Sequence, residues 1–170
     1  MILRKLNVFD EESFLNAVAS WSHDPQFRFL GGYEEGMKYS DYLTKLDNQE
    51  NGINLPEGWV PDTSYFGFLP NGEIVGRLYV RHELTEFLNR IGGHIGYGVL
   101  EKHRNNGYAT SMLKQSLKLV KGLGINKALV TCDDTNAASA KVIERCGGLL
   151  ENKVEQEGDL PPKRRYWIEV

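Results

Sequence analysis

The chain has 170 residues, of which 41% are hydrophobic and 25% charged, and its formal net charge at pH 7 is -3. These values are typical of one globular domain that is long enough to bury a hydrophobic core. The weak net charge provides no basic field for nucleic acid, and no apolar run approaches the roughly 20 residues of a membrane span. We therefore expect neither a nucleic-acid partner nor a membrane.

The charge is uneven along the chain. Residues 1–60 contain 5 Lys or Arg against 10 Asp or Glu, whereas residues 61–170 contain 15 against 13. A solvated acidic surface is the simpler interpretation, and attraction of a cationic substrate is the alternative. The N-terminal stretch MILRKLNVFDEESF has acidic residues where a signal peptide has its apolar core, and Cys132 and Cys146 form no Cys-x-x-Cys pair. Both observations favour a cytoplasmic protein without a disulfide framework.

The first 61 residues predict a short strand and two helices. Asp10 is a good N-cap for a helix whose apolar residues recur at helical spacing. Between Ser22 and Pro61 the pattern is looser and rich in glycine, but no clean linker divides it from the rest. We therefore expect a single domain over residues 1–170. The elements predicted here are a strand over Ile2–Leu6 and helices over Glu11–Trp21 and Ser40–Gln49.

From Ser64 onward the β signals are sharper. Asn71-Gly72 between two β-rich runs predicts a hairpin, and glycines in the run HIGYGVL mark a bulge or a close approach to the backbone. The predicted elements are strands over Tyr65–Leu69, Ile74–Val80 and His94–Leu100, a helix ending at Gly122 or Gly124, a strand over Ala128–Cys132, a helix ending at Gly147-Gly148, and strands over Leu149–Gln156 and Arg165–Val170. Ala109, Leu113, Leu117 and Val120 share one face of the first of these helices. This order predicts an α/β or α+β mixed sheet.

The stretch RNNGYAT, from Arg104 to Thr110, joins a predicted strand to a predicted helix. The bare N–H groups of a helix N-terminus form an anion site, although a strand also needs a turn before a helix. The P-loop pattern is absent. Gly96-x-Gly98 lacks the third glycine of the dinucleotide-binding fingerprint, because position 101 is Glu. Neither of these phosphate loops explains the stretch.

Two motifs resemble those of the GNAT superfamily of acetyl-CoA-dependent N-acetyltransferases. Its hallmark is Gln/Arg-x-x-Gly-x-Gly/Ala between the fourth strand and the next helix, here Arg104-x-x-Gly107-x-Ala109. A second mark is Asn-x-x-Ser on the helix after the following strand, here Asn136-x-x-Ser139. The resemblance covers about residues 62–156 well and the first 61 residues poorly. It implies a mixed, mainly antiparallel central sheet flanked by helices.

The resemblance implies that acetyl-CoA binds at these motifs. Successive N–H groups at the helix start suit its pyrophosphate, and Gly107 tolerates a positive φ. In the family the pantetheine arm pairs with the fourth strand, whose glycines then give close approach. A solvated turn for Arg104 and helix capping for the Asn136–Ser139 pair are the structural alternatives. The residues assigned to acetyl-CoA are Val99, Leu100, Arg104, Asn105, Asn106, Gly107, Tyr108, Ala109, Thr110, Asn136 and Ser139.

The resemblance also implies the reaction, which is direct attack of a primary amine on the thioester carbonyl in a ternary complex. Residues 1–61 would then lie on the acceptor side. The amine must lose a proton, because its ordinary pKa is about 10, and the family's base is often a Glu at the start of the fourth strand. His94 stands near that place and titrates near neutrality. His82 and Glu83 are the other candidates, and a plain structural role is the alternative for all three.

The acid of the family is missing at its usual position. Many members carry a tyrosine four residues after the Ser of Asn-x-x-Ser, where this chain has Ile143. No other tyrosine is assigned the role, so the thiolate leaves unprotonated or a water serves. This gap keeps a second function open, that of a non-catalytic acetyl-CoA or CoA-binding sensor or partner domain. A small molecule or free amino group is favoured as acceptor over a protein, no metal signature is present, and a homodimer is left open.

Overall fold

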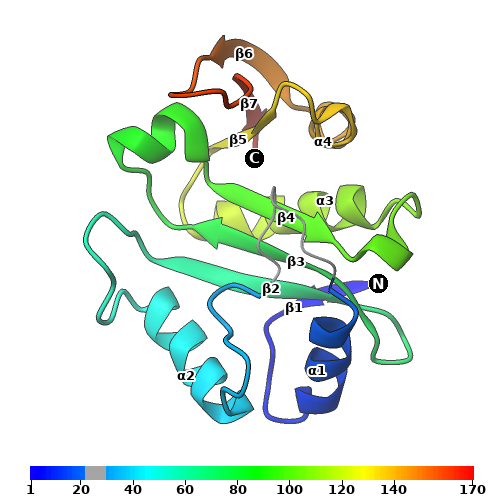
Figure 1. The fold of residues 1–170 in the computed structure, drawn as a ribbon. Helices are drawn as coiled ribbons and strands as arrows, with labels where there is room; N and C mark the ends of the chain where they lie inside the picture. Colours follow the sequence, from blue (N-terminus) through cyan, green and yellow to red (C-terminus); the bar gives the residue numbers. More distant parts are fainter. Residues whose placement is uncertain (22–29) are drawn as a thin grey trace.

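The computed structural model describes residues 1–21 and 30–170, and Figure 1 shows its ribbon. One antiparallel sheet has the strand order β1-β2-β3-β4, and a second has the order β5-β7-β6. The mixed, mainly antiparallel architecture flanked by helices is confirmed. The elements are β1 (Ile2–Arg4), α1 (Glu11–Ala19), α2 (Tyr39–Glu50), β2 (Asp62–Phe68), β3 (Ile74–Arg81), a π-helix η1 (Leu88–Gly92), β4 (Ile95–Val99), a 3₁₀ turn η2 (Glu101–His103), α3 (Tyr108–Gly122), β5 (Lys127–Asp133), α4 (Ala137–Arg145), β6 (Leu149–Val154) and β7 (Lys163–Glu169).

The predicted hairpin joins β2 to β3. Gly72 adopts a φ of 85°, and its N–H donates to the carbonyl of Leu69 over 3.0 Å. A positive φ of this size favours glycine, so the Asn71-Gly72 signal is confirmed. The π-helix η1 was not predicted. It lies in the connection between β3 and β4.

Helix α1 begins where the sequence predicts, but Asp10 does not cap it with its side chain. Both carboxylate oxygens of Asp10 instead accept hydrogen bonds from Arg4, at 2.6 and 2.7 Å, and one also accepts from the N–H of Asn7. Two charge-assisted bonds to one guanidinium are stronger than a single capping bond to a backbone N–H. Asp10 is thus the N-cap residue, as predicted, and its carbonyl accepts the first helical bond from the N–H of Phe14 over 2.8 Å, but its side chain makes no capping bond because Arg4 on β1 binds the carboxylate.

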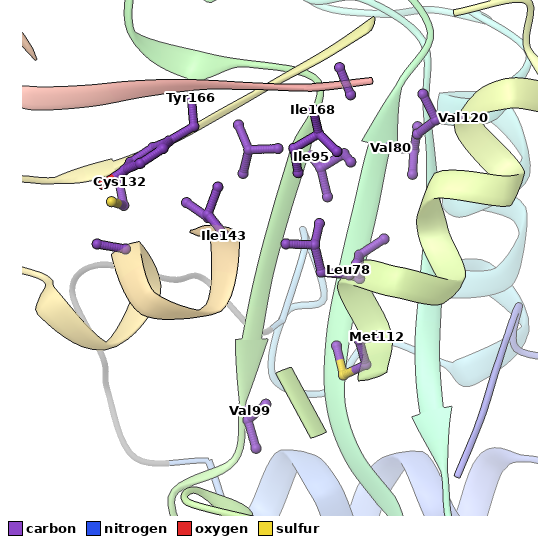
Figure 2. Packing of buried hydrophobic residues seen from close by; sticks show 14 residues of the cluster. Leu78, Val80, Ile95, Val99, Met112, Val120, Cys132, Ile143, Tyr166 and Ile168 are labelled. Atoms are coloured by element: carbon purple, nitrogen blue, oxygen red, sulfur yellow. The ribbon is translucent and has the colours of Figure 1, made fainter. Parts of the chain in front are cut away.

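Two hydrophobic clusters lie on opposite faces of the first sheet. Alternate residues of a strand point to opposite faces, and Leu78 and Val80 of β3 belong to the cluster that α3 covers, seen close up in Figure 2. Phe66 and Phe68 of β2 belong to the cluster under α1 and α2, where Phe14 stacks on Tyr42 at 4.8 Å. Figure 1 shows α1 and α2 together on one side of this sheet. Each fully buried large apolar side chain contributes about 1.5–3 kcal/mol.

Helix α3 packs the predicted apolar face against the core, and the buried face is wider than predicted. Leu113 and Val120 are fully buried, as are Met112 and Ser116 beside them. The hydroxyl of Ser116 donates to the carbonyl of Leu113 over 2.8 Å, which allows a polar side chain in this core. The wider buried face anchors α3, and therefore the turn that precedes it, against β3 and β4.

The two sheets meet where β4 begins beside β5. The N–H of His94 donates to the carbonyl of Leu129 over 2.7 Å, and the N–H of Leu129 donates to Nδ1 of His94 over 3.0 Å. Gly93, with a φ of 73°, would place a Cβ only 2.7 Å from that Leu129 oxygen, so the approach requires glycine. Among residues 1–21 and 30–170, no ladder joins β4 to β5 beyond this point. Strands β4 and β5 are therefore held together at His94 and Leu129 and separate beyond that point.

Candidate active site

A cleft of about 800 Å³ opens between β4 and β5. Residues at the C-terminal end of β3, in η1 and along β4 form one part of its wall, and the N-terminal turns of α3 and α4 form another. Nine of the eleven residues assigned to acetyl-CoA line this cleft, namely Val99, Arg104, Asn105, Gly107, Tyr108, Ala109, Thr110, Asn136 and Ser139. The two sequence motifs, which lie far apart in the chain, thus face one space.

Leu100 and Asn106 lie outside the lining. Leu100 is fully buried under α1 and α2, and its N–H donates to the carbonyl of Val75 on β3 over 2.9 Å. The side-chain amide of Asn106 donates to the carbonyls of His103 and Arg104. Asn106 therefore stabilises the turn, and Leu100 stabilises the sheet.

The turn before α3 presents backbone donors to the cleft. Asn105 and Gly107 have φ angles of 63° and 78°, and the first helical bond runs from the N–H of Ser111 to the carbonyl of Gly107. The N–H groups at the start of a helix have no intrahelical acceptor, and the dipole adds positive potential there. This end of the cleft is suited to an anion.

Basic side chains reinforce that potential, and the sequence motifs had not indicated all of them. Arg104 lines the cleft, and its Nε–H donates to the carbonyl of Val99 over 3.2 Å. Lys141 and Arg145, four residues apart on α4, also line it. Residues at this spacing share a helix face, which is the signal that could have predicted them. Together these groups favour a ligand with several negative charges.

The edge of β4 faces the cleft. Because the N–H of Leu100 points to β3, the alternation of a strand directs the N–H groups of Tyr97 and Val99 to the other side. Gly96 has a second reason to be glycine, since a Cβ there would collide with the ring of Tyr79 on β3. Tyr79 also lines the cleft. The glycine-rich strand thus leaves room for a neighbouring side chain as well as an accessible backbone edge.

Asn136 caps α4. Its Oδ1 accepts a hydrogen bond from the N–H of Ser139 over 3.0 Å. The capping alternative considered for this motif is therefore present in the structure. The cap does not prevent contact with a cofactor, because Asn136 and Ser139 both line the cleft as well.

We expect Asn136→Ala to lower the free energy of unfolding by about 1 kcal/mol, because the Ser139 N–H loses its capping acceptor. For a chain of this length the melting temperature should fall by about 2–4 °C. Asn136→Ser, which keeps a capping oxygen, is the control, and chemical denaturation measures both. Equal stability of the Ala variant and the unmodified protein would contradict the capping role.

Three polar side chains from different elements meet inside the cleft. Tyr97 of β4 and Ser139 of α4 have their hydroxyl oxygens 2.9 Å apart, and Cys132 of β5, which hydrogen-bonds Ser139, also lines the cleft. Burial raises the pKa of the Cys132 thiol to about 11, and burial also raises the pKa of Tyr97 well above its usual range. Both groups therefore keep their protons at neutral pH.

Ile143 is fully buried, away from the cleft. It belongs to the same core cluster as Leu78 and Tyr166, and Figure 2 shows it among these packed side chains. A Cβ on Gly148 would collide with its Cγ2. The position where the resemblance to the family implies a tyrosine thus serves the core in this chain.

His94, the first candidate for the base, does not line the cleft. The residue is only 8% exposed, and burial, followed by the charge of Arg81, lowers its pKa. Nδ1 accepts the Leu129 N–H, so a neutral ring carries its proton on Nε2. No lone pair of this tautomer is left for a substrate proton.

The other two candidates for the base also lie outside the lining. Nε2 of His82 lies 2.8 Å from the Thr63 hydroxyl, and Glu83 is exposed. The structure therefore brings the cofactor motifs together but does not gather His94, His82 and Glu83 around them.

Comparison with known proteins places this geometry in a family. The family model described as an acetyltransferase (GNAT) domain matches residues 1–148, which includes the N-terminal residues that the sequence motifs leave uncovered. No curated protein matches the chain. Within the described residues, no helix has the length and apolar character needed to cross a membrane.

Solved structures share the fold. A chimera of the spermidine N-acetyltransferase SpeG from Vibrio cholerae and hSSAT matches with a TM-score of 0.65 and 17% identity, over 99% of this chain and 96% of that one. A GNAT-family acetyltransferase from Streptococcus pneumoniae matches with a TM-score of 0.63 and 19% identity, over 99% of both chains. The Vibrio cholerae spermidine N-acetyltransferase in complex with CoA and spermine matches with a TM-score of 0.63 and 17% identity, over 99% and 94%.

Because these identities are below 20%, the solved structures establish only the fold of the chain. The family model establishes the family. Its match extends from the first strand through the Arg104-x-x-Gly107-x-Ala109 turn to the end of α4. With the cleft and its two motifs in place, the chain belongs to the GNAT family and is an acetyltransferase that uses acetyl-CoA.

Proposed function

We propose that this protein moves the acetyl group of acetyl-CoA to a small primary amine by direct attack within a ternary complex in the β4–β5 cleft. The observation that carries the proposal is the convergence of the Arg104–Gly107 turn and the Asn136–Ser139 pair on one cleft. The pyrophosphate would bind the N–H groups at the start of α3. Arg104, Lys141 and Arg145 would supply charge to the phosphates.

The pantetheine arm would run along the free edge of β4. The N–H groups of Val99 and Tyr97 face the cleft, and pairing with them resembles the addition of a strand. The thioester would then lie deeper along β4, where a strand N–H is able to stabilise the developing oxyanion. Ser139 and Tyr97 would border the sulfur.

The acceptor would approach from the face that α1 and α2 cover. Tyr79 and Arg81 alternate with Leu78 and Val80 on β3, so they point away from α3, and both line the cleft. We infer that the amine proton leaves to water, because none of the three candidate bases lines the cleft. One structural neighbour binds spermine, which makes polyamines part of any acceptor panel.

Acetyl-CoA is expected to raise the melting temperature. A ligand at 100 times its dissociation constant stabilises the native state by about 2.7 kcal/mol, or about 5–10 °C for a chain of this length. Thermal denaturation with acetyl-CoA, and with acetate as a control, measures this shift. The absence of a shift at saturating acetyl-CoA would contradict the proposed site.

The alternative of a CoA-binding sensor is favoured by one observation, the burial of Ile143 where an acid is usual. A thiol-release assay across polyamines, amino acids and short peptides separates the two functions. We expect release of CoA that depends on one class of amine. Binding of acetyl-CoA without release across all these classes would favour the sensor.

A further inference from the structure

The Tyr97–Ser139 pair bridges the cleft from β4 to the first turn of α4. Ser139 Oγ lies 2.9 Å from the Tyr97 hydroxyl oxygen, whereas the Ser139 backbone carbonyl is 3.3 Å from it. Hydrogen bonds between oxygens usually measure 2.5–3.0 Å. The shorter contact therefore fixes the phenol, and the longer one is weak.

The side chain of Ser139 also hydrogen-bonds the Cys132 thiol, so two hydroxyl protons and one thiol proton are distributed over these contacts. With the Ser139 hydroxyl donating to the phenol oxygen, the Tyr97 proton is held only by the weak bond to the carbonyl. A stronger acceptor in the cleft would capture it, because hydrogen bonds to charged acceptors are about twice as strong as neutral ones. A thiolate sulfur bound beside α4 is such an acceptor.

We propose that the Tyr97 hydroxyl donates a hydrogen bond to the sulfur of the departing CoA thiolate, with Ser139 holding the phenol in place. The proposal rests on the proposed function, and it deepens it by assigning the missing leaving-group donor to β4. Many relatives supply a tyrosine hydroxyl from the α4 position that is Ile143 here. Because Ile143 is packed in the core, the same chemical group reaches the cleft from the opposite wall.

The step keeps its electrons and protons in balance. As the bond from the amine nitrogen to the acetyl carbon forms and the carbon–sulfur bond breaks, the electron pair of the latter stays on sulfur. The nitrogen gives its proton to water. Burial raises the pKa of Tyr97 above its ordinary value near 10, and a thiol titrates near 8.5. Tyr97 therefore keeps its proton and acts as a donor throughout, not as a source of the thiol proton.

The test uses CoA alone, so it does not depend on knowing the acceptor. The thiol pKa of protein-bound CoA is followed by the ultraviolet absorbance of its thiolate in the unmodified protein and in Tyr97→Phe. A hydrogen bond to a charged group corresponds to about one to two pKa units. We expect the bound thiol pKa to be higher in the Phe variant by about that amount, and kcat to fall about ten- to a hundredfold with the KM for acetyl-CoA unchanged.

Tyr166→Phe is the matched control. Its hydroxyl lies 3.1 Å from Glu144 Oε1, and the ring is buried in the core cluster against which Tyr97 packs, but it does not line the cleft. This variant should leave the bound thiol pKa unchanged. Should Tyr97→Phe fail to fold, Tyr97→Met decides, because it also removes the hydroxyl and puts a flexible apolar side chain in its place, so the bound thiol pKa should rise in the same way.

The outcomes separate the two proposals. An equal thiol pKa for CoA bound to the unmodified protein and to the deciding variant would overturn the role of Tyr97 while leaving the cofactor site intact. Failure of CoA to shift the melting temperature of the unmodified protein would overturn the proposed function itself.

Discussion

Replacement of Gly107 by glutamate is expected to weaken acetyl-CoA binding at least about a hundredfold. The residue precedes the first turn of α3 and lines the cleft, so a carboxylate there would face the pyrophosphate. Two unit charges about 4 Å apart repel by about 1 kcal/mol in water and about 4 kcal/mol at a protein surface, and each 1.4 kcal/mol is a tenfold change in affinity. The glutamate side chain would also block access of a phosphate to the backbone N–H groups at the start of α3.

The chain contains a matched control for backbone strain. Gly124 follows the same helix at its other end with a φ of 79°, against 78° for Gly107, and an added Cβ meets nothing within 4 Å at either position. A left-handed conformation costs a side chain about 1–2 kcal/mol. Gly124→Glu therefore carries the same strain, far from the turn at Arg104. It should lose stability without losing acetyl-CoA affinity.

Isothermal titration with acetyl-CoA, at a temperature well below each melting transition, measures the effect. Gly107→Ala adds the strain alone and should keep most of the affinity. The prediction fails if Gly107→Glu is folded and binds acetyl-CoA as tightly as Gly124→Glu does, because the turn would then not hold the phosphates.

The position of this turn could be predicted because its causes are local. A glycine that must adopt a positive φ, a helix start and a strand before it are all encoded within a few residues around Gly107. The same holds for Asn71-Gly72 in the β2–β3 hairpin. The Asn136-x-x-Ser139 motif is also local, since one side chain caps the N–H of the other.

The rest of the site depends on contacts between distant residues. Tyr97 meets Ser139 across 42 positions of sequence, and His94 meets Leu129 across 35. Nothing near His94 distinguishes a base from an interstrand acceptor, and only the neighbouring strand decides. The side-chain partner of Asp10 was missed for the same reason, because Arg4 lies on β1 and not in the helix.

His94→Ala is expected to destabilise the protein by about 3 kcal/mol. The N–H of Leu129 would lose its acceptor, and a buried unsatisfied donor costs about 1–3 kcal/mol, to which the vacated volume adds. For a chain of this length the melting temperature should fall by about 6–12 °C. His94→Asn is the control, because its Oδ1 takes the place of Nδ1 and keeps the hydrogen bond, so it should retain much of the stability.

The same residue should make stability depend on pH. Burial lowers the pKa of His94 in the folded state below the ordinary value of about 6.5, so below that pH the unfolded chain binds a proton that the folded chain does not. Stability due to His94 is therefore complete above about pH 6.5 and declines as the pH falls toward the lower folded-state pKa. Asn does not titrate, so the stability advantage of the unmodified protein over His94→Asn should narrow with acidification.

Urea denaturation of the unmodified protein and His94→Asn, at pH values above and below 6.5, measures this difference. The pH–rate profile of acetyl transfer provides the independent readout of chemistry. A structural acceptor leaves the shape of that profile unchanged in a folded Asn variant, since its titrating group is not used in the reaction. Loss of an inflection near neutrality with unchanged folding would instead make His94 the base. The junction would then have to open during turnover, because only rupture of the Leu129 hydrogen bond frees the lone pair on Nδ1.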